Sequence, residues 1–251
     1  MDSSAPRIGF RKIVCTIPTY NESENILPLC REILALGPQF HVLVIDDDSP
    51  DGTWRLVEEA GRSEARLRVL RRTSDKGRGR SGRDGFVEAL RAGADAVIEM
   101  DADFSHPPRY IPSLIERLEK GRPSIGLVLG SRGVPGGSDA DRGLPRRLLT
   151  KAANLYIRLL LGLRVKDCNS GFRCWSREAL QRIRVEETVS VGPGIVQELL
   201  FKTARAGIGI AELPIEFVDR TRGTSTLTFG KLITGYTTVL KLRWLAIRGK
   251  L

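Results

Sequence analysis

The chain has 251 residues, of which 41% are hydrophobic and 28% charged, and it carries a formal net charge of +10 at pH 7. No stretch approaches the roughly 18 to 20 consecutive apolar residues of a membrane-spanning helix, and residues 1–12 lack the apolar centre of a signal peptide. We therefore expect a soluble or peripheral intracellular protein, long enough to bury a sizeable core in one large or two small domains.

The first two thirds of the chain alternate strand-like and helix-like segments. We expect strands at residues 12–20, 41–48, 67–72, 96–102 and 125–131, and helices at residues 24–36, 52–62, 85–93 and 109–121. Strands that are apolar throughout and are linked by helices indicate a doubly wound, mostly parallel α/β sheet with both faces covered. In such a fold, ligands bind at the carboxyl ends of the strands.

In the last third of the chain, the sequence predicts fewer strands than in the first two thirds. We expect helices at residues 144–163 and 194–207, strands at residues 170–176 and 210–220, and a helix in the tail at residues 228–251. The tail mixes apolar residues with Lys and Arg and carries Trp244. Two interpretations stay open: the tail helix packs on its own domain, or it lies on an acidic lipid surface.

Charge and cysteine usage limit the partners. Lys and Arg gather at residues 62–83, 142–166 and 241–250, which suits a phosphorylated ligand, an anionic membrane or nucleic acid, although a solvated arginine-rich surface explains part of the excess. The chain has four scattered cysteines among apolar neighbours: Cys15, Cys30, Cys168 and Cys174. This pattern argues against a zinc knuckle or a disulfide framework and predicts free thiols in a reducing compartment.

Polar residues follow three of the expected strands at the edge where a ligand would bind. The first strand runs into PTYNE (18–22), the second into DDDS (46–49) and the fourth into DAD (101–103). Helix capping accounts for Ser49 and Asp51 but leaves Asp46, Asp47, Asp101 and Asp103 unexplained. We therefore expect a functional site where these three segments converge.

Residues 77–82, GRGRSG, match the G-x-G-x-x-G dinucleotide fingerprint, but their context does not. The fingerprint belongs after the first strand of the sheet, whereas this stretch follows the third and holds Arg78 and Arg80. We expect it to form a loop that brings glycine flexibility and positive charge beside a phosphate-bearing donor rather than a binding site for NAD.

The D-x-D turn of Asp101 and Asp103 suits a hard divalent cation. The chain has only two histidines, His41 and His106, so a histidine-rich metal site is excluded. Two carboxylates beside an arginine-rich stretch can hold a cation that takes its other ligands from water and a diphosphate. Such a cation neutralises charge on a leaving diphosphate.

These motifs, taken in order, resemble the GT-A glycosyltransferases of family 2, specifically the dolichol- or polyprenyl-phosphate mannose synthases. The resemblance rests on PTYNESEN, IDDDSPDGT, MDADFSHPP, GSR, DCNSGFR, QELL and PIEFVDRTRGTS, and it covers nearly everything from Ile13 to about Ser225. It implies a GT-A fold, with a Rossmann-like sheet and flanking helices, as a catalytic domain over residues 1–226. A basic amphipathic helix over residues 227–251, associated with a membrane, would follow.

The same resemblance implies a metal-dependent, inverting glycosyltransferase. It would move a hexosyl group, with mannose from GDP-mannose as the first choice, to a polyprenyl (dolichyl) phosphate. The implied cofactor is Mg²⁺ or Mn²⁺, and the implied partners are the nucleotide-sugar donor, the lipid phosphate and an anionic membrane surface. A separate membrane subunit is left open, nucleic acid is not expected, and the expected location is peripheral on the cytoplasmic face of a membrane.

The resemblance also assigns roles to residues. The nucleotide pocket would be lined by Pro18, Tyr20, Glu22, Asp46, Asp47 and Asp101. The cation would be held by Asp101 and Asp103, with Ser105 as a weak third ligand. The catalytic group would comprise Asp103 and three phosphate-binding arginines: Arg132, Arg146 and Arg220. Glu198 would stand in the active-site wall.

One departure and two alternatives remain. Thr226 stands where the family usually has a phosphate-contacting lysine, and Lys231 comes five residues later. The first alternative is a family 2 transferase with UDP-glucose or another donor, or with an acceptor other than a polyprenyl phosphate. The second is a non-catalytic basic binding protein, which the acidic strand ends and the 6% aromatic content disfavour. A lipid phosphate is already an anion, so transfer of a sugar to it needs no general base. His106 is therefore expected to be structural.

Overall fold

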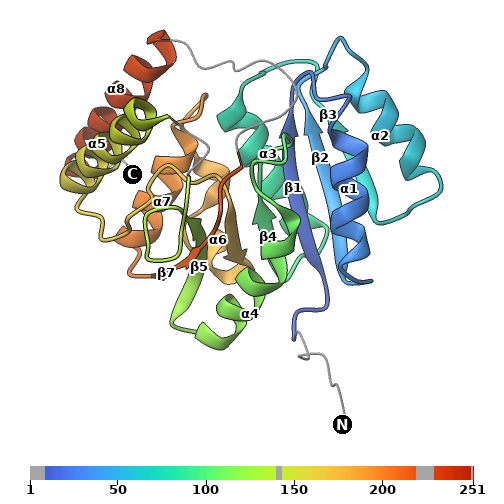
Figure 1. The fold of residues 1–251 in the computed structure, drawn as a ribbon, viewed down its shortest axis with the longest axis horizontal. Helices are drawn as coiled ribbons and strands as arrows, with labels where there is room; N and C mark the ends of the chain where they lie inside the picture. The colour runs from blue at the N-terminus through green and yellow to red at the C-terminus, as the bar shows by residue number, and fades with distance from the viewer. Residues whose placement is uncertain (1–8, 140–142, 219–228, 250) are drawn as a thin grey trace.

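The computed structural model describes residues 9–139, 143–218, 229–249 and 251. One seven-stranded sheet runs through it in the order β3-β2-β1-β4-β6-β5-β7. The strands are β1 (Ile13–Thr19), β2 (Phe40–Asp46), β3 (Leu67–Arg71), β4 (Ala96–Glu99), β5 (Ile125–Ser131), β6 (Arg173–Ser176) and β7 (Gly209–Pro214). Figure 1 shows the sheet between its flanking helices, as the α/β interpretation predicted.

Helices cover both faces of the sheet. The helices are α1 (Ile26–Ala35), α2 (Thr53–Gly61), α3 (Arg78–Arg91), α4 (Ile111–Gly121), α5 (Leu144–Leu161), α6 (Arg177–Arg182), α7 (Ile195–Arg205) and α8 (Phe229–Ile247). One apolar core lies between the sheet and α1, α2 and α4, and a second lies between the sheet and α3, α5, α6, α7 and α8. Successive β1 side chains point to opposite faces of the sheet, so Cys15 lies in the first core and Val14 in the second.

Most neighbouring strands are parallel, which confirms the mostly parallel sheet. β1 pairs in parallel with β2 and β4, and β5 pairs in parallel with β7. β6 lies antiparallel between β4 and β5. All four residues of β6 are buried, and a strand that is buried on both faces has the same pattern in either direction, so the sequence gives no sign of this reversal.

The glycine-rich stretch is not a loop, so that expectation was wrong. Gly77, with φ +139°, precedes α3, and residues 78–82 form its first turns. A Cβ on Gly79 would lie 2.6 Å from the carbonyl oxygen of Gly192, and one on Gly85 would lie 2.7 Å from Ile45 Cδ1. The glycines are needed because other parts of the same chain pack closely against this helix.

Several element boundaries also differ from expectation. β4 ends at Glu99 and β7 at Pro214, whereas the sequence suggested residues 102 and 220. The short helix α6 was not expected. All four cysteines are buried and free, as predicted.

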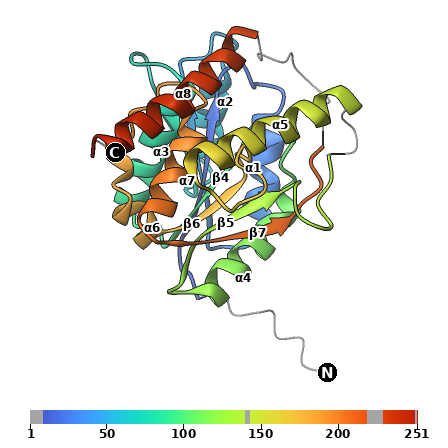
Figure 2. The ribbon, with the colours of Figure 1, turned by 90° about the vertical axis from the view of Figure 1, so that its left-hand side faces the viewer.

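The C-terminal helix α8 packs on the domain. Val239 and Leu242 belong to the second core, and Figure 2 shows α8 running beside α5. The other sides of α8 expose Leu240, Trp244 and Ile247. Within the described residues, no helix combines the length and apolar character needed to cross a membrane.

Candidate active site at the carboxyl ends of the strands

The carboxyl ends of β1, β2 and β4 bring three of the predicted segments to one edge of the sheet. Thr19 is paired with Asp46 in the β1–β2 ladder, and the Met100 N–H donates to the Thr16 carbonyl oxygen over 3.3 Å. The D-x-D turn therefore follows a strand adjacent to the one that ends in PTYNE. The pattern of polar strand ends was a sufficient signal for this convergence.

Asp46 is a fully buried anchor of this edge. Its Oδ2 accepts hydrogen bonds from the hydroxyls of Thr19 and Ser49, both at 2.7 Å, and its Oδ1 accepts from the Ser49 N–H at 2.8 Å. Oδ2 thus joins the end of β1 to the loop after β2, and Oδ1 stabilises that loop from within. At this part of the edge, Asp46 is fully buried and the neighbouring Pro18 is half-buried.

Asp47 ties the end of β2 to the start of α3. It forms an ion pair with Arg72 and accepts a hydrogen bond from the Gly77 N–H at 2.7 Å. The Nε of Arg72 lies 2.9 Å from Asp84 Oδ2, on the same helix. The side chains of Asp46 and Asp47, two predicted nucleotide-pocket residues, therefore form hydrogen bonds and an ion pair within the protein.

Other side chains at this edge are more open. Tyr20 is 56% exposed, and Glu22 lies in the turn before α1, where the Asn25 amide donates to it over 2.9 Å. Asp48, which the sequence reasoning did not single out, has φ +58° and forms ion pairs with Arg71 and Lys76. Hydrogen bonds from these two cations lower the pKa of Asp48.

The two carboxylates of the D-x-D turn differ in exposure. The Asp101 side chain is 44% exposed, whereas Asp103 is buried and its Oδ1 accepts from the Ser105 N–H at 3.1 Å. Ser105 is itself buried. The described residues contain no group of three or more His, Cys, Asp or Glu side chains able to hold a metal ion alone. This donor set fits a hard cation that takes several ligands from water and a diphosphate.

His106 supports the turn from inside the fold. Its ring is buried, stacks on Phe172 with 5.2 Å between centroids, and accepts a hydrogen bond at Nδ1 from the Asp101 N–H over 3.2 Å. Burial lowers the pKa of His106, so the ring is neutral. A buried neutral ring that holds backbone fits the structural role expected for it.

The predicted phosphate-binding arginines have different surroundings. The Arg132 guanidinium forms two hydrogen bonds with buried Asp167, which the sequence reasoning did not single out. Burial alone raises the pKa of Asp167, but Arg132 holds that pKa below its ordinary value. Arg146 lies exposed on the first turns of α5. Arg220 and Thr226 lie outside the described residues.

Glu198 lies behind a loop rather than on an open wall. It is fully buried in the first turn of α7 and accepts hydrogen bonds from the backbone N–H groups of Val189 and Ser190, at 2.9 and 2.8 Å. The same loop accepts from the Gly79 N–H at the Val191 carbonyl, over 2.8 Å. Glu198 thus holds the loop that packs on the start of α3.

Two further charged residues lie beside the D-x-D turn: Arg78, which the sequence analysis placed near the donor, and Glu99, which it did not single out. Arg78, on the first turn of α3, lies 3.4 Å from Asp101 and 3.3 Å from Glu99 (Nη2 to carboxylate oxygen). Glu99 is 1% exposed at the end of β4. The sequence did contain a signal for Glu99, because a single acidic residue within the apolar run AVIEM requires a partner of opposite charge.

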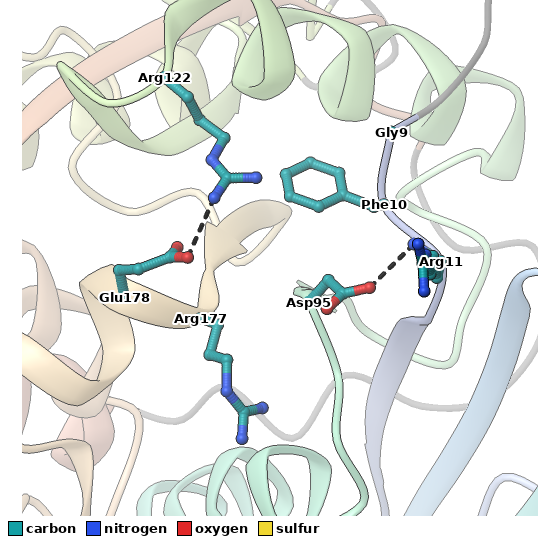
Figure 3. A pocket seen from close by; sticks show the side chains of 7 residues that line it. All are labelled: Gly9, Phe10, Arg11, Asp95, Arg122, Arg177 and Glu178. Carbon is teal, nitrogen blue, oxygen red and sulfur yellow. Dashed lines mark hydrogen bonds and ion pairs between the residues drawn. The ribbon is translucent and has the colours of Figure 1, made fainter.

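The pocket in Figure 3 lies away from this edge. It is lined by residues that precede β1 and β4, together with the end of α4 and the start of α6. The amino ends of parallel strands lie opposite their carboxyl ends. Two of its three arginines are also engaged: Arg122 pairs with Glu178 at 3.0 Å, and Arg177 donates to the carbonyl of Ala94 at 2.7 Å. The strand-edge site therefore remains the candidate active site.

The strand order and the D-x-D turn at the sheet edge define an α/β transferase of the GT-A class. The sequence profile described as glycosyl transferase family 2 matches residues 15–184, and the chain belongs to that family. It is a glycosyltransferase, as the motifs indicated.

Three curated relatives are similar over most of the chain. The undecaprenyl-phosphate mannosyltransferase of Micrococcus luteus is 36% identical, over 93% of this chain and 93% of its own length. The polyprenol monophosphomannose synthase of Mycolicibacterium smegmatis is 35% identical, over 96% and 89%. The dolichol-phosphate mannosyltransferase of Pyrococcus furiosus is 36% identical, over 90% of this chain and 61% of its own length.

Solved structures confirm the fold. The glucosyl-3-phosphoglycerate synthase of Mycobacterium tuberculosis, solved with Mn²⁺, UDP-glucose and phosphoglyceric acid, superposes with a TM-score of 0.69. The alignment covers 93% of this chain and 80% of that one, at 24% identity.

Proposed function

We propose that this glycosyltransferase moves a mannosyl group from GDP-mannose to a polyprenyl phosphate, with inversion at the sugar carbon. The observation that carries the proposal is the 35–36% identity to three mannosyltransferases or mannose synthases whose names specify undecaprenyl phosphate, a polyprenol or dolichol phosphate. The D-x-D turn at the carboxyl edge supports it, because this donor set suits a sugar diphosphate with its cation.

The reaction follows from the charges of the two substrates. A phosphate oxygen of the lipid attacks the sugar carbon, the bond from that carbon to the donor diphosphate breaks, and GDP leaves with the bonding electrons. The attacking oxygen carries no proton that must be removed, so no general base is needed. A divalent cation, when bound, neutralises charge on the leaving diphosphate. Arginines must hold two phosphate groups together against their repulsion.

All predicted site residues except Pro18 have a place in this proposal. Asp101 and Asp103 would hold Mg²⁺ or Mn²⁺, with Ser105 contributing mainly through its backbone. Asp46 would act by fixing the end of β1, which leads into the loop with Tyr20 and Glu22, and Asp47 by fixing the start of α3. The phosphate contacts would come from Arg132, Arg146 and Arg220, and Glu198 would support the loop beside α3.

A membrane surface is the proposed place of action. The neighbouring helices α5 and α8 expose several large apolar side chains: Leu144, Leu148, Leu149, Leu155, Leu159, Leu240, Trp244 and Ile247. Exposed Lys151, Lys241 and Arg243 lie on the same two helices. Apolar side chains beside basic ones suit an interfacial position on anionic lipid, which we place on the cytoplasmic face.

The deciding experiment measures lipid-linked sugar. The purified chain is incubated with Mn²⁺, a polyprenyl phosphate in detergent and either GDP-mannose or UDP-glucose. We expect mannosyl transfer, loss of most activity in Asp103→Asn, and full activity in Glu178→Gln at the opposite end of the sheet. No product from either donor, or an active Asp103→Asn variant, would contradict the proposal. Product on a soluble phosphate acceptor alone would favour the alternative acceptor, and activity of the purified chain would show that no membrane subunit is required.

A further inference from the structure

A group of four charges lies directly behind the D-x-D turn. Glu99, at the end of β4, is 1% exposed, and its residue partner in the antiparallel ladder is Arg173, which is fully buried. From the neighbouring helix α3, the Nη2 of Arg78 lies 3.3 Å from Glu99 Oε1 and 3.4 Å from Asp101 Oδ1. Two cations and two anions therefore meet at one side of the turn.

Burial makes Glu99 dependent on these cations. A carboxylate inside a sheet loses its hydration, and the loss is tolerated only when opposite charge lies close by. Arg173 is fixed by its own hydrogen bonds to the carbonyls of Ser170 and Val196, at 2.8 and 2.6 Å. Arg78 is the second cation, and Glu99 in turn determines where the Arg78 guanidinium rests.

Packing also limits the guanidinium of Arg78. Its Nη1 lies 3.1 Å from the position that a Cβ on Gly82 would take, so the side chain rests against α3 at a residue without a side chain. Arg78 Nη1, Glu99 Oε2 and Arg173 Nη2 are buried without a hydrogen-bond partner among the residues that the structure describes. Opposite charge, more than saturated hydrogen bonding, therefore holds the group together.

We propose that Arg78, positioned by Glu99, is a built-in counter-cation of Asp101 that weakens the binding of a free divalent cation to the D-x-D turn. This inference rests on the cation site of the proposed function. A cation that binds Asp101 must share that carboxylate with a guanidinium already beside it, and the two positive charges repel. A donor diphosphate brings enough negative charge to outweigh the repulsion. The cation would thus bind well only together with the nucleotide.

The proposal separates two binding events. In the free enzyme, Arg78 neutralises Asp101 and keeps the turn from taking up a cation without a donor. In the donor complex, Asp101 and Asp103 would hold the cation together with the donor, and Arg78 would remain paired with Glu99. Arg78 is therefore a positioning residue that acts through Asp101.

The test is a Mn²⁺ titration followed by electron paramagnetic resonance, with and without GDP. Arg78→Met alone would leave Glu99 buried with one cation fewer, so the main variant is the double change Arg78→Met with Glu99→Gln, which removes one charge of each sign. We expect the double variant to bind free Mn²⁺ about fivefold more tightly than the wild type. The reason is that the repulsion between the Arg78 guanidinium and the cation, which solvent partly screens, is removed. With GDP present, the difference should shrink to less than about twofold.

Two further variants control for charge and fold. Arg78→Lys keeps the cation and should bind free Mn²⁺ within about twofold of the wild type. Arg83→Met removes a cation from the same helix, where Arg83 pairs with Asp84 at 2.8 Å, and should also leave Mn²⁺ affinity unchanged. Thermal unfolding of each variant establishes that it is folded before titration.

The outcomes separate this inference from the proposed function. Equal Mn²⁺ affinity of wild type and double variant, equal tightening in Arg83→Met, or no Mn²⁺ binding by either protein would overturn the role of Arg78. A wild type that binds Mn²⁺ only with GDP, beside a double variant that binds it alone, would support that role. Absence of transfer to polyprenyl phosphate would sink the proposed function, while the Mn²⁺ comparison would still decide the inference.

Discussion

Arg132 holds Asp167 with two parallel hydrogen bonds, from Nε to Oδ2 at 2.7 Å and from Nη2 to Oδ1 at 2.8 Å. The Arg132 N–H donates to the same carboxylate at 3.1 Å. Arg132 follows the last residue of β5, and Asp167 lies in the loop before β6, so the pair joins the ends of two adjacent strands. Because Asp167 is 1% exposed, solvent screens the pair little.

Breaking this pair should cost stability. Asp167→Asn keeps the shape but removes the charge and leaves the guanidinium buried, so we expect a loss of about 3 kcal/mol in the free energy of unfolding, measured by urea titration. The double change Arg132→Met with Asp167→Leu should cost less than Asp167→Asn alone. A double variant less stable than the single one would contradict this account.

The same pair predicts a pH dependence. The folded-state pKa of Asp167 lies below its ordinary value, so its contribution is fully present above about pH 4 to 5 and is lost as the pH falls through the folded-state pKa. The stability difference between wild type and Asp167→Asn should therefore be constant near neutral pH and shrink in acid. Urea titrations between pH 7 and pH 3 would show this, and a difference that grows in acid would contradict it.

Gly79→Ala should destabilise the start of α3. The new Cβ would fall against the backbone carbonyls of the loop at residues 190–192, which cannot yield as a side chain can. We expect a loss of about 2 kcal/mol or more, despite the higher helix propensity of Ala. Gly192→Ala is the matched control, since a Cβ there meets nothing within 4 Å. Equal melting temperatures of the two variants would count against this packing.

Glu198→Gln tests the support of that same loop. The carboxylate accepts two backbone N–H bonds and lies 3.6 Å from Lys202 Nζ, whereas an amide is neutral and has one accepting oxygen, so one partly buried donor and the lysine lose their partner. We expect a loss of about 1–3 kcal/mol in thermal unfolding. Glu187→Gln, at a side chain that is 49% exposed, should change stability by less than about 0.5 kcal/mol. Identical effects of the two changes would argue against the buried role.

Membrane binding should depend on the exposed side of α8. Trp244→Gln with Ile247→Gln removes two exposed apolar contacts and leaves the buried Val239 and Leu242 in place. We expect liposome binding, measured by sedimentation with anionic vesicles, to fall about tenfold or more. Leu56→Gln on α2, 40% exposed, is the control and should bind as the wild type does. Equal binding by all three proteins would leave α8 a packing element alone.

The sequence was sufficient to predict the layers of the fold and the meeting of three strand ends, because hydrophobic period and strand-end polarity report these directly. It could not show which carboxylates face inward. Asp46 ends one buried strand and Asp101 follows another, yet Asp46 is fully buried and the Asp101 side chain is 44% exposed. That difference depends on partners distant in sequence, such as Thr19 for Asp46.

The direction of β6 was beyond the sequence for a similar reason, and so was the helical state of residues 78–82. Glycine propensity favours a loop there, but packing against the loop held by Glu198 overrides it. Asp167 was quoted within a motif, but the motif gave no sign of the partner 35 residues earlier.

The antiparallel position of β6 has a consequence for how the chain folds during synthesis. β1, β2, β3 and β4 pair among themselves, and all of them have been made by residue 99. Among the described strands, β5 pairs with β6 and β7 alone, so residues 125–131 are synthesised with no strand to join until residue 173 follows. During the synthesis of the more than forty residues between β5 and β6, the nascent chain therefore carries the apolar strand β5 with both edges unpaired. An unpaired apolar strand can pair with other chains, so aggregation is most favoured in this interval.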